Sequence, residues 1–198
     1  MQPADIDALA AALGVALPRE LRGLLERTAQ IEGTAVGTID LTGATMDYED
    51  RDLFPAGLPI AHDGAGNFWV LDLVPDAETA AVLFASHDPP LAVYVSGGLA
   101  PFLERVSAGE VPPQTVTPVP TLSHDEALAG DAELRAFASG LDDRFVFGDL
   151  RDAEPGAAFE WGSFGPRTEV RRAGFSRVFA CAPPAQKAER RRLFGRRR

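Results

Sequence analysis

The sequence is poor in several features that define whole classes of protein. Cys181 is its single cysteine, so no disulfide can form within the chain, and a reducing cytoplasm is the expected location. No apolar run approaches the roughly 18–20 residues that a membrane-spanning helix requires. The first residues lack a basic stretch and carry Asp5 and Asp7, which argues against a secretory signal peptide. We therefore expect a cytoplasmic protein with no membrane partner.

Lysine is almost absent, because Lys187 is the one lysine among 19 basic residues, a bias associated with GC-rich bacterial genomes. Seven of the basic residues lie in the last twelve positions. Residues 1–186 hold 12 basic and 28 acidic side chains, a net charge of -16, whereas the whole chain carries -10. Such a surface repels nucleic acid and attracts basic partners, with association that weakens as salt rises. Plain solubility is the alternative explanation.

The composition is that of a folded protein, with 45% hydrophobic and 24% charged residues. We expect a core over residues 1–109, a proline-rich linker over 110–122 and an α/β extension over 123–183. The extension either completes the sheet of the core or forms a separate lobe. The basic tail, residues 184–198, is expected to be disordered. It serves as a solubilising end, contacts nucleic acid without specificity, or folds back on the acidic body.

Periodicity predicts the elements of the N-terminal half. The helical spacing of Ile6, Leu9 and Leu13 indicates an amphipathic helix over residues 4–13, ended by Gly14. A second helix should begin at Pro18 and end at Glu32-Gly33, where glycine is free to take the left-handed conformation. Strand patterns then cover residues 34–41, 58–61, 68–73, 80–88 and 91–97, and a helix follows from Leu99 to about residue 108.

The C-terminal half begins with a proline-rich passage, residues 109–121, which should be an extended linker or run along a sheet edge. Helices are predicted over residues 123–128 and 131–141, and short strands over 144–150, 158–162, 168–174 and 176–182. Ser123 is a suitable cap for the first of these helices.

Trp69 stands in the strand predicted over residues 68–73. Alternation places Phe68, Val70 and Asp72 on one face of that strand, and Trp69, Leu71 and Leu73 on the other. Packing in the core is the expected role of Trp69, and an exposed binding anchor is the alternative.

All three histidines precede an aspartate, as His62-Asp63, His87-Asp88 and His124-Asp125. Pairs of this kind hold metals in some phosphohydrolases, where they stand on helices beside further ligands. Here His62 belongs to a glycine-rich turn and His87 to a strand end, so no metal site is expected. Cys181 lies in an apolar strand without a neighbouring histidine, which indicates a buried structural thiol. We assign no catalytic residue and no cofactor, and we do not expect an enzyme.

Three stretches carry a family resemblance: LGVALPRELRGLL (13–25), LPIAHDGAGNFWVLDL (58–73) and AVLFASHD (81–88), the last followed by a helix with Phe102. In order and spacing, over about residues 4–108, they resemble the SUKH superfamily of fungal cell-wall-synthesis regulators and bacterial immunity proteins. Residues 34–57 and 110–198 lie outside the match, and Glu32 stands where asparagine is commoner. The motif positions are held by Leu17, Pro18, Glu20, Gly33, Asp63, Gly64, Gly66, Asn67, Trp69, Asp72, His87, Asp88 and Phe102.

The resemblance implies an α+β fold, a mixed β-sheet flanked by helices, with a C-terminal β-rich extension outside the shared core. It also implies a non-catalytic protein-binding module, which in bacteria is an immunity protein that neutralises a cognate toxin domain. A regulatory or scaffold domain with a housekeeping partner is the alternative. The negative charge of residues 1–186 agrees with a basic toxin, such as a nuclease, whose cleft an acidic protein can occupy.

The expected partner-binding surface is the acidic segment 46–52 with neighbouring turns. A solvated loop or short helix without a binding role is the alternative for this segment. We expect no specific nucleic acid as a partner, and the oligomeric state stays open. The partner-binding residues expected are Asp47, Tyr48, Glu49, Asp50, Asp52, His87 and Asp88.

Overall fold

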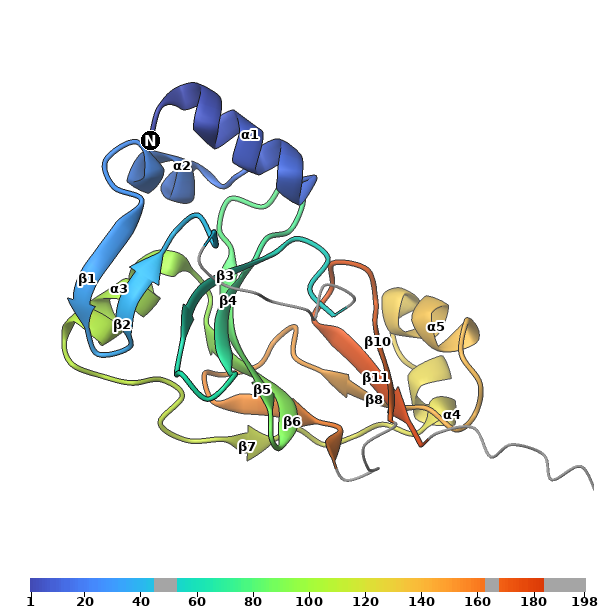
Figure 1. The fold of residues 1–198 in the computed structure, drawn as a ribbon. Helices are drawn as coiled ribbons and strands as arrows, with labels where there is room; N and C mark the ends of the chain where they lie inside the picture. The colour runs from blue at the N-terminus through green and yellow to red at the C-terminus, as the bar shows by residue number, and fades with distance from the viewer. Residues whose placement is uncertain (45–52, 163–167, 184–198) are drawn as a thin grey trace, which may run out of the picture.

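The computed structural model describes residues 1–44, 53–162 and 168–183, which form an α+β fold (Figure 1). The helices are α1 (Pro3–Leu13), α2 (Arg19–Leu25), α3 (Leu99–Ser107), α4 (His124–Leu128) and α5 (Ala132–Ser139). The strands are β1 (Gln30–Thr34), β2 (Gly37–Asp40), β3 (Gly57–His62), β4 (Phe68–Asp72), β5 (Ala81–His87), β6 (Pro90–Ser96), β7 (Thr117–Pro118), β8 (Val146–Asp149), β9 (Ala157–Glu160), β10 (Glu169–Arg172) and β11 (Val178–Ala182).

The central feature is a mixed six-stranded sheet with the order β3-β4-β5-β6-β9-β7. Neighbouring strands are antiparallel from β3 to β9, and the short β7 pairs in parallel with β9. Strands β10, β11 and β8 form a separate antiparallel sheet, and β1 and β2 form a hairpin. The C-terminal half therefore adds β9 and β7 to the central sheet, and its strands β8, β10 and β11 form a second sheet.

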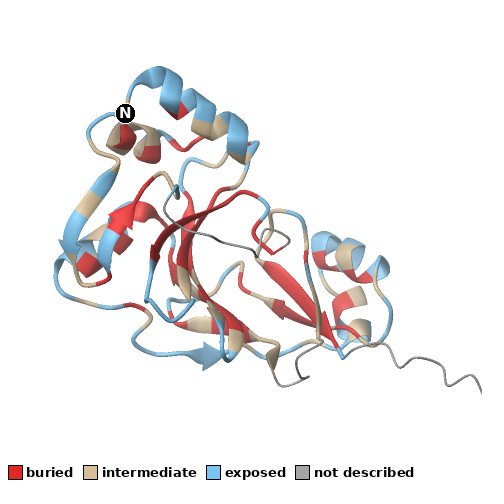
Figure 2. Cartoon of the chain, in the orientation of Figure 1, coloured by how far each residue is buried: buried red, intermediate tan, exposed pale blue. Residues whose placement is uncertain are grey.

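Both faces of the central sheet are covered, which explains why its strands are apolar throughout. In β4 the predicted alternation is confirmed, since Trp69 and Leu71 belong to one buried cluster and Val70 to another. The first cluster joins this sheet to α1, α2, the β1–β2 hairpin and α3. The second joins it to β11, where Phe179 and Cys181 are fully buried. Figure 2 shows these buried strands between more exposed helices.

Trp69 packs in the core, as predicted, and its side chain is 2% exposed. Its indole Nε1–H donates a hydrogen bond of 2.6 Å to the carbonyl oxygen of Pro112. Because a buried indole N–H needs an acceptor, this bond ties the proline-rich passage to the sheet. The passage then reaches the sheet edge as β7, so the strand-edge alternative is the one observed.

The predicted end of the second helix at Glu32-Gly33 is wrong, since α2 ends at Leu25. The amides of Arg27 and Thr28 both donate to the Leu24 carbonyl and close the helix in a turn. The chain then enters β1, where Ile31 pairs with Ile39. Gly33 does have a positive φ of 72°, but it lies at a shift of register within the hairpin, where a bulge needs that conformation.

The other helix signals hold. Gly14 ends α1 with a φ of 70°, in the left-handed conformation expected of it. Ser123 caps α4, because its hydroxyl accepts from the Glu126 amide while the Glu126 carboxylate accepts from the Ser123 amide. The prediction that Ser123 caps this helix is therefore confirmed.

A buried ion pair links β4 to β10 across 100 residues of chain. Arg172 donates two parallel hydrogen bonds to Asp72, at 2.8 and 2.7 Å, and both side chains are 1% exposed. Its three remaining N–H groups donate to the carbonyl oxygens of Leu53, Phe175 and Ser176. All five guanidinium donors are therefore satisfied, as a buried arginine requires.

Removing one partner of this pair should destabilise the fold strongly. We expect Arg172→Met to lower the free energy of unfolding by about 3–5 kcal/mol, because Asp72 would remain buried and unpaired. The double variant Arg172→Met/Asp72→Leu should lose less than the two single variants together, since no lone charge is left. Urea denaturation measures each value.

Arg171→Met is the matched control, because Arg171 is the exposed neighbour and bonds to the carbonyl oxygen of the adjacent Val170. Its effect should stay within about 0.5 kcal/mol. A loss below about 1 kcal/mol for Arg172→Met would contradict the role given to the pair.

Candidate functional site

The turn between β3 and β4 is built on Asp63. Its Oδ1 accepts hydrogen bonds from the amides of Ala65, at 2.8 Å, and Asn67, at 3.2 Å. Its Oδ2 accepts from the Asn67 side-chain amide at 2.6 Å. An aspartate that bonds backbone groups a few residues ahead fixes a tight turn, so this motif position has a structural role.

The same turn is joined to the β5–β6 hairpin through His87. Asn67 Oδ1 accepts from the His87 amide at 3.1 Å and lies 3.1 Å from its Nδ1. Gly66 has a φ of 92°, and a Cβ built there would stand 3.0 Å from the His87 ring. The positive φ favours glycine, and a larger residue would also have to displace the His87 ring by a small amount. His87 and Asp88 are exposed beside the turn, so two of the motifs meet on one surface.

The carboxyl of Asp63 has a pKa below its ordinary value. Partial burial opposes ionisation, but the hydrogen bonds from the Asn67 side chain and from the Ala65 and Asn67 amides outweigh it. Since these bonds favour the charged form, Asp63 is an anion at neutral pH and holds the turn as an acceptor.

The three histidines have different hydrogen-bond partners. His62 Nδ1 accepts from the Gly64 amide at 3.1 Å, and His124 Nε2–H donates to the Ala138 carbonyl at 3.1 Å. In the described parts of the chain, no group of three or more His, Cys, Asp or Glu side chains is arranged to hold a metal ion. Burial raises the pKa of the Cys181 thiol to about 12, so this cysteine is not a nucleophile at neutral pH.

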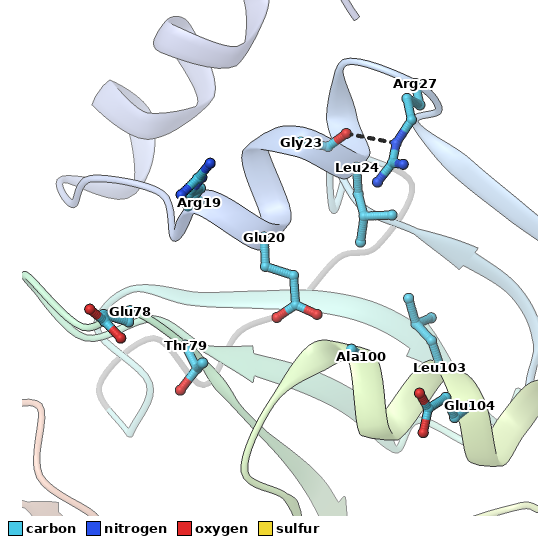
Figure 3. Close-up of a pocket in the computed structure, with 10 residues that line it drawn as sticks. All are labelled: Arg19, Glu20, Gly23, Leu24, Arg27, Glu78, Thr79, Ala100, Leu103 and Glu104. Atoms are coloured by element: carbon cyan, nitrogen blue, oxygen red, sulfur yellow. Dashed lines mark hydrogen bonds between the residues drawn. The ribbon is translucent and has the colours of Figure 1, made fainter.

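The described residues form a groove between α2 and α3, closed at one end by the β4–β5 loop (Figure 3). Its volume is about 840 Å³, within the range of binding pockets, and it is open to solvent. Leu24, Leu103 and Ala100 give it an apolar floor. The remaining lining is charged or small: Arg19, Glu20, Gly23, Arg27, Glu78, Thr79 and Glu104.

The groove and the Asp63 turn lie at opposite ends of β4, because the turn precedes that strand and the loop with Glu78 follows it. Glu20 lines the groove, whereas His87 and Asp88 belong to the turn surface. Leu17, Pro18 and Phe102 are buried. The residues expected to bind the partner in the acidic segment lie outside the described residues: Asp47, Tyr48, Glu49, Asp50 and Asp52. No helix among the described residues is long and apolar enough to cross a membrane.

Sequence reasoning missed Arg172 and most of the groove. A signal for Arg172 was present, because Asp72 interrupts the apolar strand FWVLDL and a buried acid needs a cation. No signal identified Glu78 or Glu104 as neighbours of α2, since helix packing brings together residues that are far apart in the chain. Nothing in the sequence distinguishes Arg19 and Arg27 from other polar residues of the predicted second helix.

The low pKa of Asp63 predicts how its contribution changes with pH. A carboxyl whose native pKa lies below its unfolded value of about 3.9 stabilises fully above that value, and the effect is lost as pH falls through the native pKa. Asp63→Ala should therefore cost about 1 kcal/mol at neutral pH and less in acid. Denaturation of both proteins over a pH series tests this.

Asp88→Ala is the control, as an exposed aspartate whose side chain bonds to no described residue. It should have little effect at any pH. An NMR titration that placed the Asp63 pKa at or above the unfolded value would refute the interpretation.

Comparisons with known proteins identify the family of the chain. Neither the search of curated proteins nor the search of solved structures found a match. The scan against family models matches residues 1–105 to the SMI1 / KNR4 family (SUKH-1). Those residues include α1, α2, both motif turns and most of α3, and they cover more than half of the sequence. This chain therefore belongs to the SMI1 / KNR4 family (SUKH-1).

Proposed function

We propose that this chain is a cytoplasmic bacterial immunity protein, which binds and neutralises a cognate toxin domain. The SUKH family is generally non-enzymatic, and membership is consistent with a non-catalytic binding module. Within such a family, the observation that carries the proposal is the net charge of -16 over residues 1–186. A folded surface with that excess of acid suits a basic partner better than a neutral one.

Neutralisation then works by occlusion. Many toxins that act on nucleic acid have basic clefts built for phosphate, and a carboxylate-rich surface can fill such a cleft in place of the substrate. Long-range attraction raises the association rate, and salt screens it over about 10 Å at 0.1 M. The proposal places the contact on the acidic segment 46–52 together with the exposed His87 and Asp88.

The test begins with a pull-down by the tagged protein from its native cytoplasm, at about 50 mM and about 300 mM salt, with identification by mass spectrometry. We expect capture of a basic toxin domain, and weaker capture at the higher salt. Co-expression of the chain with the captured domain should restore the growth that the domain alone prevents. Capture of a resident housekeeping protein, with no rescue of growth, would instead favour the regulatory or scaffold role.

The acidic segment has its own prediction. Changing Asp47, Glu49, Asp50 and Asp52 to Asn or Gln should slow association with the captured domain about tenfold or more at low salt. Stopped-flow or surface-binding kinetics measure this rate. The structure offers a control of equal charge on the opposite half of the chain. It consists of Asp125, Asp143, Asp152 and Glu154, which are exposed and form no ion pair with described residues.

Equal slowing by both quadruple variants would show that total charge matters and that segment 46–52 does not. The assigned surface would then be wrong, while the immunity role would still be decided by the rescue of growth. Slowing confined to the variant in residues 46–52 would support both.

A further inference from the structure

We propose that the groove between α2 and α3 is the docking site for an amphipathic segment of the protein partner, with two apolar side chains next to a Lys or Arg. This inference rests on the proposed protein-binding function and names the chemistry of the contact. It concerns a surface separate from segment 46–52 and from the turn with His87.

The floor of the groove defines the apolar part of the partner. Leu24 of α2 and Leu103 of α3 face each other and are half-buried, and Ala100 lies exposed on α3 beside Leu103 (Figure 3). A Cβ added to Gly23, which lines the groove on the α2 side, would meet no atom within 4 Å, so the groove is open at this position. The nine residues of α3 span about 14 Å, which accommodates about two turns of a partner helix. Two apolar side chains one turn apart fit that length.

The charged walls of the groove define the basic part of the partner segment. Glu20 extends from α2 toward the β4–β5 loop, Glu78 lies on that loop and Glu104 lies on α3 (Figure 3). None of the three forms an ion pair with a described residue. Some carboxylates elsewhere are bound within the chain, as Arg151 pairs with Asp131, Glu133 and Asp149, so what distinguishes Glu20, Glu78 and Glu104 is their place around an apolar groove. Three carboxylates that pair with no described residue, placed around an apolar floor, are complementary to a cation carried beside apolar side chains.

The two arginines give the groove a direction. Arg19 and Arg27 lie near the two ends of α2, and Arg27 Nε donates to the Gly23 carbonyl at 3.0 Å. They repel a cation that approaches the outer side of α2, so the basic side chain of the partner should lie toward α3 and the loop. Because the arginines repel the partner's cation on one side and the carboxylates attract it on the other, the charges determine the orientation of the bound segment as well as its affinity.

The lining also argues against other ligands. Phosphate groups of a nucleic acid would meet Glu20, Glu78 and Glu104, which repel them. Small-molecule sites have a few buried polar groups that converge on the ligand, whereas the charged residues here are at the surface. An open groove with an apolar floor between two helices is the arrangement that binds an amphipathic helix.

A peptide selection tests the groove without any knowledge of the toxin. The probe is a phage library of random 16-residue peptides, selected on the immobilised protein. We expect the enriched peptides to carry Lys or Arg beside Leu, Ile, Met or Phe pairs, and to lose at least about tenfold in affinity for Gly23→Phe, which fills the groove. Ala136→Phe is the control, since Ala136 is exposed on α5. It should bind the peptides unchanged.

A second variant covers the case in which Gly23→Phe does not fold, which circular dichroism would reveal. The triple change Glu20→Gln, Glu78→Gln and Glu104→Gln keeps the shape and removes the charge. It should weaken the same peptides about tenfold at low salt and much less at high salt. Peptides without a basic residue, peptides that bind all variants equally, or no enrichment would overturn the proposal.

These outcomes are distinct from failure of the immunity role. Because the selection contains no toxin, a missing growth rescue leaves its result unaffected. Conversely, a captured toxin domain that binds Gly23→Phe as well as it binds the unchanged protein would keep the proposed function and exclude the groove.

Discussion

The ion pair between Asp72 and Arg172 is the contact on which the arrangement of the two halves depends. Asp72 lies on the face of β4 that the C-terminal sheet covers, so its charge would be uncompensated in an apolar layer without Arg172. The Arg172 guanidinium also lies over the rings of Phe54 and Phe179, with centroid distances of 5.5 and 5.4 Å. A buried pair of this kind adds little stability over apolar residues, but it fixes which strands face each other.

That constraint leaves the two ends of β4 with different tasks. At one end, the carboxylate of Asp63 accepts hydrogen bonds from the backbone amides of Ala65 and Asn67 and from the Asn67 side chain, and so holds the turn. At the other end, Glu20 and Glu78 have none among the described residues. Acidic residues of the same kind are thus structural in one place and available in another. The difference lies in the neighbours, which composition and net charge do not record.

Much of the fold follows from local patterns in the sequence. The alternation around Trp69, the capping by Ser123 and the left-handed Gly14 are local signals, and each corresponds to the element expected. The end of α2 was not predicted correctly, because the positive φ of Gly33, which is typical of a helix end, occurs here within the β1–β2 hairpin. The groove could not be predicted from the sequence, because it forms where α2 packs beside α3, and no local pattern shows that these two helices are neighbours. The position of Asp72 within an apolar strand implies a buried cationic partner, but nothing in the sequence identifies Arg172 as that partner.

The pairing of β9 with β6 has a consequence for how the chain can be divided. The family match ends within α3, yet the strand that covers the outer side of β6 comes more than fifty residues later. A chain cut after α3 would leave β6 with free backbone amides and carbonyls beside Leu91 and Val93, which Ala158 of β9 now helps to bury. An apolar edge of that kind recruits strands from other molecules. Aggregation of such a fragment would therefore reflect a missing strand, and would not count against the fold of the family region.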